Sequence, residues 1–252
     1  MLNDFDRNAA YRAAIRESAA GRVVYDLGAG VGPMSYYALA AGARRVYGFE
    51  IDGAAFAYLR RLRRRFRNFV PLRRDVVRGR LPEAVPEVIV CEMWSAWLTE
   101  WPMAKALSRL LARAPGATVI PARGHHVVQL VRARHRAGLP IEIVPGTTAS
   151  LINETPATME MSLPALACVT EFAAPLAPVH VTVPLTPLTT GRVNAVRLYS
   201  YEEVSPGRIL TRLGSRSDEI IRWIPPLDVR RGRQVHLRIE HAWGARIAVR
   251  VE

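Results

Sequence analysis

The pattern of hydrophobic and polar positions divides the chain into two parts of different character. From residue 22 to about 120, short apolar runs alternate with helical patterns, which is typical of a parallel α/β sheet. Beyond Pro121 the pattern predicts strands separated by Pro/Gly turns, with almost no long helical segment. These strands are expected at Val127–Val131, Ile141–Val144, Val179–Val183, Ala195–Tyr199, Val235–Ile239 and Ile247–Val251. We therefore expect one domain over residues 1–121 and a second, mostly antiparallel domain over residues 122–252.

Helices in the first part are predicted over residues 1–20, which have strong helix formers and no breaker before Gly21, and over residues 52–69. The second of these helices has an apolar stripe at steps of three and four residues, so one face should be buried. Its other face carries six arginines: Arg60, Arg61, Arg63, Arg64, Arg65 and Arg67. Such a face is either simply solvated or a patch that binds nucleic acid or acidic peptides.

Composition limits the class of protein. The chain has 252 residues, half of them apolar, and a formal net charge of +13. No apolar run has transmembrane length and the start of the chain lacks the apolar core of a signal peptide, so we expect a soluble protein without a membrane partner. Two cysteines form neither a disulfide framework nor a metal site, which makes a cytoplasmic location the default. The excess of arginine makes nucleic acid a possible partner.

A strand followed by a glycine turn lies near the start of the first domain, over Val23–Gly32. Gly28 and Gly30 would let the backbone approach a ligand that a side chain would block. Glu50 follows the next predicted strand, where it could accept hydrogen bonds from both hydroxyls of a ribose. This combination predicts a nucleoside cofactor.

The acidic residues around this turn favour one cofactor over another. Asp26 precedes the first glycine, where it would repel a pyrophosphate but could hold the cationic amino-acid tail of S-adenosylmethionine. Asp75 follows a further strand and could accept from an adenine amino group, with the Val76 amide facing the ring. S-adenosylmethionine is therefore favoured over NAD. The alternative is a tight turn without a ligand.

A loop rich in acids and aromatic residues follows the strand that ends near Val90. Glu92 and Glu100 bracket it, at the carboxyl end of a strand where such folds place their chemistry. Two carboxylates could hold a guanidinium group and draw a proton from the attacking nitrogen. The alternative is an ordinary surface loop in which Glu100 begins a helix. The six histidines lack ligand spacing, so no metal site is expected.

Taken together, these motifs resemble the protein arginine methyltransferase family over nearly the whole chain. The segment Met1–Arg12 resembles the stretch before the family's cofactor strand, Asp26–Gly32 its first motif, and Glu92–Glu100 its double-Glu loop. The resemblance implies a Rossmann-like S-adenosylmethionine-binding domain followed by a mostly antiparallel, β-barrel-like substrate domain. It also implies that Arg7 binds the carboxylate of the cofactor and that Glu92 and Glu100 hold the target arginine.

Several departures from the family pattern bear on function. Arg222 and Trp223 stand where the family has Thr-His-Trp, so the histidine that pairs with the acid matching Asp4 is replaced. Arginine does not give up its proton at neutral pH, but an Asp4–Arg222 ion pair could tie the N-terminal helix to the second domain. The sequence begins too late to include the family's aromatic N-terminal helix, so we expect the lid to be missing or supplied otherwise. The region that matches the dimerisation arm is short, which argues against the usual ring dimer and leaves the oligomeric state open.

The sequence thus favours an S-adenosylmethionine-dependent N-methyltransferase that acts on an arginine-bearing protein. An RNA or small-molecule amine methyltransferase with the same cofactor is the first alternative, because the basic helix could bind RNA. The second is a non-catalytic cofactor-binding scaffold, since a lid is expected to be missing and Arg222 replaces a histidine.

Overall fold

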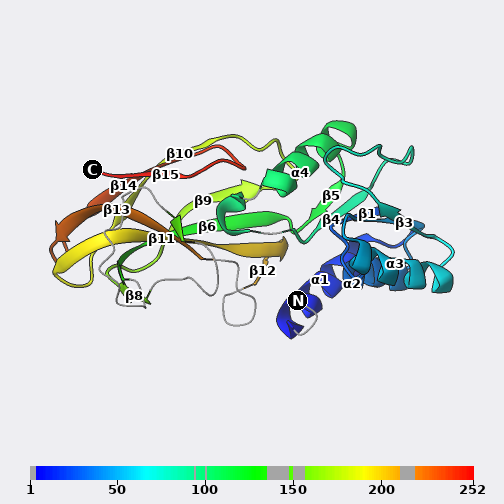
Figure 1. The fold of residues 1–252 in the computed structure, drawn as a ribbon, viewed down its shortest axis with the longest axis horizontal. Coiled ribbons are helices and arrows are strands. Elements are labelled where there is room, and N and C mark those ends of the chain that lie inside the picture. The colour runs from blue at the N-terminus through cyan, green and yellow to red at the C-terminus, as the bar shows by residue number, and fades with distance from the viewer. Residues whose placement is uncertain (1–3, 94, 100, 135–147, 150–156, 211–218) are drawn as a thin grey trace.

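The computed structural model describes residues 4–93, 95–99, 101–134, 148–149, 157–210 and 219–252, and it contains a parallel sheet followed by antiparallel sheets (Figure 1). The helices are α1 (Phe5–Ser18), α2 (Pro33–Ala40), α3 (Gly53–Arg65), the 3₁₀ helix η1 (Ala96–Leu98) and α4 (Trp101–Arg113). The strands of the first part are β1 (Val23–Leu27), β2 (Arg45–Glu50), β3 (Phe69–Arg73), β4 (Val88–Cys91) and β5 (Thr118–Ile120). Those of the second part are β6 (Arg123–Arg134), β7 (Thr148–Ala149), β8 (Ala157–Glu160), β9 (Ala165–Glu171), β10 (Val179–Leu185), β11 (Gly191–Ser205), β12 (Arg208–Leu210), β13 (Ile220–Val229), β14 (Val235–His241) and β15 (Ala248–Val251).

The parallel sheet has the strand order β3-β2-β1-β4-β5 and helices on both faces. Alternate residues of β1 point to opposite faces, as the pleat of a strand requires. Val24 packs in the core beneath α1, α2 and α3, whereas Tyr25 packs in the core beneath α4. The chain runs from β1 outward to β3 and then returns to β4 on the other side of β1, so the topological switch point lies between β1 and β4.

The N-terminal helix begins where the sequence supplies a cap. Asp4 accepts from the amide of Arg7 at 3.1 Å, which satisfies an N–H group that the first turn leaves without a partner. The alanine-rich helix then packs against α2. As a result, Arg7 lies in the first turn of α1 and its side chain is largely buried.

One helix is shorter than its sequence pattern predicts. The helix expected over residues 52–69 ends at Arg65, because Phe66 takes an extended conformation and Phe69 begins β3. Only Leu59 of the predicted apolar stripe is fully buried on α3, while Phe56 and Leu62 are half-buried against the same core. The six arginines on the other face are exposed, and among the described residues none of them forms an ion pair.

The change from parallel to antiparallel pairing falls between β5 and β6. Long strands dominate the second part: β11 pairs with β6 on one side and with β13 on the other. A smaller sheet has the order β10-β14-β15. These observations confirm the predicted fold class, an α/β part followed by a mostly antiparallel part, while the domain boundary at residues 121 and 122 stays a prediction.

The antiparallel part differs in detail from the expected strands. Four of the five expected runs within the described residues coincide with β6, β10, β11 and β14, and β15 begins one residue later than predicted. The run Ile141–Val144 lies outside the described residues. The sequence did not predict β13, because Pro225 and Pro226 interrupt its strand pattern. None of the helices in the described residues is both long enough and apolar enough to span a lipid bilayer.

Candidate active site

The candidate site lies at the switch point of the parallel sheet, where β1 and β4 end side by side. Leu27 and Cys91 are paired across these strands, so Gly28 and Glu92 follow them at neighbouring positions. Loops that leave the sheet at a switch point diverge and form a crevice, which is where open α/β folds bind ligands. The glycine turn and the acidic loop, predicted separately, are therefore brought together.

The glycine turn presents bare backbone. Gly28 and Gly30 have φ values of 65° and 56°, a left-handed conformation that glycine adopts without a steric penalty. A Cβ atom on Gly28 would stand 2.6 Å from the Cγ atom of Met93, the residue after Glu92. A Cβ on Gly30 would meet only the carbonyl oxygen of Gly28, at 4.0 Å, so the space above Gly30 is open.

The Glu50 carboxylate accepts a hydrogen bond from this turn. Its Oε2 atom accepts from the Gly30 amide at 2.7 Å, and its Oε1 atom accepts from the amides of Ile51 and Asp52, both at 2.7 Å. Since a carboxylate has about four acceptor positions, these three bonds fix its orientation and leave capacity for one more. Binding of ribose hydroxyls by Glu50 stays a prediction.

Asp26 lies beneath the turn and is almost completely buried. Its Oδ2 atom accepts from the Ser35 hydroxyl at 2.6 Å, and its residue exposure is 1%. Burial raises the pKa of Asp26 to about 7, the bond from Ser35 opposes this, and the charges of Glu92 and Glu50 raise the pKa further. The three acids are thus within electrostatic reach of one another. Contact between Asp26 and a cofactor tail stays a prediction.

The predicted adenine contacts lie on the loop after β3. Asp75 is exposed and accepts from the Val77 amide at 2.8 Å, while Val76 is buried. Arg109 of α4 donates to the carbonyl oxygens of Val76 and Val77, both at 2.9 Å, which fixes the loop against the second helical layer. The structure therefore orders this segment, and its role toward adenine stays a prediction.

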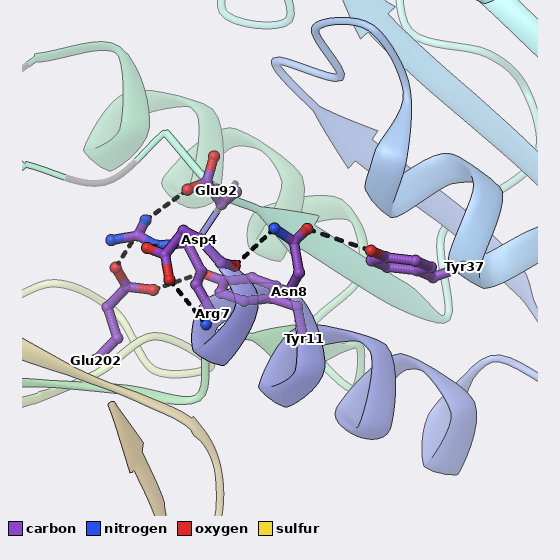
Figure 2. A network of polar contacts seen from close by, with 7 residues as sticks. All are labelled: Asp4, Arg7, Asn8, Tyr11, Tyr37, Glu92 and Glu202. Carbon is purple, nitrogen blue, oxygen red and sulfur yellow. Dashed lines mark hydrogen bonds and ion pairs between the residues drawn. The ribbon is translucent and has the colours of Figure 1, made fainter. Parts of the chain in front are cut away.

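Arg7 joins the N-terminal helix to the acidic loop. Its Nη1 atom donates to Glu92 Oε1 at 2.5 Å and lies 3.2 Å from Glu202 Oε1, while Nε contacts Asp4 Oδ2 at 3.3 Å (Figure 2). One guanidinium group thus faces three carboxylates. The cluster has a surplus of negative charge, and it is buried, so it favours a second cation or a bound proton.

Glu202 is the member of this cluster that sequence reasoning missed. It lies on β11, and its Oε2 atom accepts from the Tyr11 hydroxyl at 2.7 Å (Figure 2). Burial raises the pKa of Glu202 to about 7, against the lowering effect of Arg7. Tyr11 is also fully buried, which raises the pKa of its hydroxyl. Glu202 stands next to a second acid, Glu203, near the end of a strand that also carries arginines, so the sequence alone offers no signal that would have identified it.

Glu92 has the properties expected of a group that binds a cation. Burial raises its pKa above the ordinary value, and the adjacent Arg7 lowers it. Its predicted partner Glu100 lies outside the described residues, as does Trp94. The part of the loop that the structure describes, Ser95–Thr99, is buried except for the half-buried Thr99. The pairing of Glu92 with Glu100 around an acceptor therefore stays a prediction.

Arg222 and Trp223 belong to β13 and have different surroundings. Trp223 is buried against Val131 and Ile221. Arg222 lines a cavity of about 270 Å³ together with Thr99 and Arg246; burial and the charge of Arg246 lower its pKa.

The Asp4 side chain pairs with Arg7 of its own helix. The ion pairs of the described residues join Asp4 to Arg7, not to Arg222. The suggested Asp4–Arg222 tie is therefore not observed in the part of the chain that the structure describes. Instead, the contacts of Arg7 and Tyr11 with Glu202 connect α1 to the second part of the chain.

Comparison with known proteins gives short sequence matches and, among the solved structures, matches that include an extensive one. No protein-family model matches the chain. Over 58 residues, 22% of this chain, the sequence is 48% identical to the probable histone-arginine methyltransferase CARM1 of Oryza sativa, of which the match spans 11%. Over 65 residues, 25% of this chain, it is 45% identical to the probable histone-arginine methyltransferase 1.4 of Arabidopsis thaliana, of which the match spans 12%. The chain thus matches only about one ninth of these curated relatives.

The structural match extends over the whole chain. A solved structure of the PRMT1 enzyme-prozyme heterotetrameric complex of Trypanosoma brucei with AdoHcy covers 100% of this chain, which in turn covers 91% of that one, with a TM-score of 0.77 and 17% identity. At this identity the likeness shows a common fold. The chain is thus similar in fold, over its full length, to a PRMT1 structure, and similar in sequence, over the matched segment, to proteins named histone-arginine methyltransferases.

Proposed function

We propose that this protein is an S-adenosylmethionine-dependent methyltransferase whose acceptor is the guanidinium group of an arginine in a protein. The observation that carries the proposal is the ion pair between Arg7 and Glu92, which joins the two groups expected to serve the donor and the acceptor. The names of the matched relatives, and the AdoHcy with which the structural neighbour was solved, support the same activity.

The residues present fit the donor. The bare backbone at Gly30 leaves open space where a side chain would lie, and Glu50 retains acceptor capacity next to it. Arg7 supplies the cation that would bind the carboxylate of the methionine tail. Asp26, Glu50, Asp75 and the Val76 amide complete the proposed donor set. S-adenosylmethionine, when bound, supplies an electrophilic methyl group.

Glu92 would act on the acceptor. A buried carboxylate binds a guanidinium through charge-assisted hydrogen bonds and fixes the direction of its nitrogen lone pairs. Holding the nitrogen in line with the methyl carbon supplies much of the rate of such a transfer. Together with Glu100, Glu92 would also stabilise the additional positive charge that methyl transfer places on the guanidinium until one proton leaves the methylated nitrogen.

The test is methyl incorporation from labelled S-adenosylmethionine into three acceptors in parallel: an arginine-rich protein, RNA and free arginine. Labelled methylarginine in the protein hydrolysate is the expected result. Label in RNA alone would instead favour the RNA methyltransferase, with the arginine face of α3 as its binding surface. Tight donor binding without transfer to any of the three would overturn the proposal in favour of a cofactor-binding scaffold.

Two narrower proposals accompany this function. Closure of the antiparallel sheets into a barrel is inferred from the family resemblance and is compatible with the pairing of β11 between β6 and β13. A cytoplasmic location is inferred from the free cysteines Cys91 and Cys168. Assembly is left open, since the heterotetramer belongs to the structural neighbour.

A further inference from the structure

Two residues in the middle of the acidic loop have a backbone conformation that side chains disfavour. Trp97 and Leu98, in η1, have φ values of 55° and 47°, and they are the only non-glycine residues with positive φ in the described part of the chain. Left-handed backbone at bulky residues persists only where the surroundings over-determine it, and such sites cluster near functional groups. In the sequence these residues lie between Glu92 and Glu100.

Trp97 is held at three atoms by the antiparallel part of the chain. Its amide donates to the Ser200 hydroxyl of β11 at 2.9 Å, and its carbonyl oxygen lies 2.8 Å from His241 Nε2 of β14. Its indole Nε1 donates to the carbonyl oxygen of Val127 in β6 at 3.2 Å. The side chain is completely buried. Three strands of one part of the chain thus fix one residue of a loop that leaves the other part.

The neighbouring residue is fixed from the same side. The Gly244 amide, three residues after His241, donates to the carbonyl oxygen of Leu98 at 3.1 Å. The carbonyl groups of the left-handed pair are therefore bound by His241, at the end of β14, and by the segment that follows it. These bonds add to the turn's own backbone bonds, from Leu98 to Ser95 and from Thr99 to Ala96, so they stabilise a conformation that the loop alone would not keep.

Aromatic packing surrounds these contacts. His126 faces the Ser200 hydroxyl through Nδ1 at 2.8 Å and Thr170 through Nε2 at 3.0 Å. Its ring centre lies 5.1 Å from that of Trp97 and 5.1 Å from that of Trp243, and Trp243 lies 4.9 Å from His241. The side chains of Ser200 and His241 therefore have little freedom to leave Trp97.

The protonation state of His241 follows from its partner. A carbonyl oxygen only accepts, so the proton must be on Nε2, which leaves Nδ1 as an acceptor. Nδ1 is buried and has no hydrogen-bond partner among the described residues. Burial lowers the pKa of His241, and it lowers that of His126 to about 3, so both imidazoles stay neutral in neutral solution.

We propose that Ser200 and His241 are positioning residues for acceptor binding: by holding the amide and the carbonyl of Trp97, they set the course of the loop between Glu92 and Glu100. The inference rests on the proposed function, because it assigns these contacts to the acceptor and not to the donor. The donor groups on the glycine turn adjoin β1 and β2, which neither residue contacts in the hydrogen bonds described.

The first experiment separates acceptor binding from donor binding. Ser200→Ala and His241→Leu are expected to raise the KM for an arginine-rich protein and to lower kcat/KM at least about tenfold, since small displacements of a positioned group have large effects on rate. Donor affinity, measured by calorimetry, should change less than about twofold. His241→Gln can still donate at the Nε2 position and should recover most of the loss, whereas His236→Leu, on the exposed side of β14, is the matched control.

The second experiment measures the local stability of the loop and does not depend on catalytic turnover. Amide hydrogen exchange of Trp97 and Leu98 should accelerate at least about tenfold in Ser200→Ala and His241→Leu, with exchange in β1 unchanged. Unchanged exchange, or a loss of donor affinity as large as the loss of kcat/KM, would overturn the positioning role. If the native chain transfers no methyl group, the proposed function fails, while the exchange data still decide whether the two residues position the loop.

Discussion

Arg7 and Glu92 are 85 positions apart in the chain and are joined by a buried ion pair at 2.5 Å. The first stands in the opening turn of α1, and the second follows β4 at the switch point of the sheet. In the proposed function Arg7 serves the donor and Glu92 the acceptor. The ion pair therefore connects the two halves of the site, and substitutions at its two ends test the contribution of each half separately.

Substitution of Glu92 by glutamine should separate catalysis from donor binding. The amide keeps the shape of the side chain but loses the charge that holds a guanidinium, so methyl transfer should fall by about 10² or more. Donor affinity should stay within about threefold, because Arg7 keeps its charge-assisted contacts with Asp4 and Glu202. Labelled-methyl assays and calorimetry measure the two quantities.

Glu171→Gln is the matched control for that experiment, because Glu171 forms a largely exposed ion pair with Arg123. Exposed pairs contribute little, so both activity and donor affinity should be close to those of the native chain. Full turnover of the Glu92→Gln protein would remove Glu92 from the catalytic set.

Substitution of Arg7 by lysine should weaken the donor side. Lysine keeps the charge but lacks the planar fork that contacts three carboxylates and would bind a carboxylate with two hydrogen bonds. We expect the Kd for S-adenosylmethionine to rise about 10- to 100-fold, which corresponds to the loss of one strong charge-assisted bond. Calorimetry provides the measurement, and an unchanged Kd would show that Arg7 is only a structural partner of Glu92.

Comparison of substitutions at Gly28 and Gly21 isolates the effect of the close contact between Gly28 and Met93. Both have left-handed backbone, with φ values of 65° and 70°, but a Cβ on Gly28 would collide with Met93 whereas a Cβ on Gly21 would meet nothing within 4 Å. Gly21→Ala should cost about 1–2 kcal/mol of unfolding free energy and leave donor binding intact. Gly28→Ala should cost about 1–3 kcal/mol more, because of the collision with Met93, and should weaken donor binding, because Gly28 belongs to the turn proposed to approach the donor.

Chemical denaturation of the two alanine variants, with donor titration of each, checks this difference. Equal losses of stability in both variants would show that the Met93 contact relaxes without cost. The comparison is independent of the acceptor and applies even if the acceptor is not a protein.

The parts of the site that follow local rules could be predicted from the sequence. The glycine turn, Glu50 at the end of β2 and Glu92 after β4 each stand at the carboxyl end of a strand, and the order of apolar runs is enough to locate those ends. Even the pairing of the turn with the acidic loop follows from the switch point, since parallel strands end at a common edge.

Contacts between distant segments could not be predicted in this way. Tyr11 and Glu202 are 191 positions apart, and nothing in the spacing of either indicates the other. The same holds for Trp97, whose amide and carbonyl are held by Ser200 and His241. The extent of α3 was overestimated because Phe66 and Phe69 continue a helical spacing, although Phe69 belongs to β3. Tertiary pairing overrides periodicity at such positions.

Glu202 gives the protein a pH dependence of stability with a definite sign. Burial raises its pKa to about 7 in the folded protein, above its ordinary value of 4.5. The folded state therefore binds this proton more tightly than the unfolded state, so the contribution of Glu202 to the unfolding free energy decreases as pH rises through that interval. Glu202→Gln has no such proton and should lack the decrease.

The expected result is a difference between variant and native unfolding free energies that shifts in favour of Glu202→Gln by about 1–3 kcal/mol between about pH 5 and pH 8. Loss of the contact with Arg7 also changes the unfolding free energy of the variant, but by an amount that varies little over this pH range. The change of the difference with pH is therefore what tests the prediction. Urea denaturation at several pH values measures it, with Glu171→Gln, at an exposed position, as the control. A slope identical to that of the native chain would mean that Glu202 is ionised throughout and that the surplus proton of the cluster resides on Glu92 or Asp26.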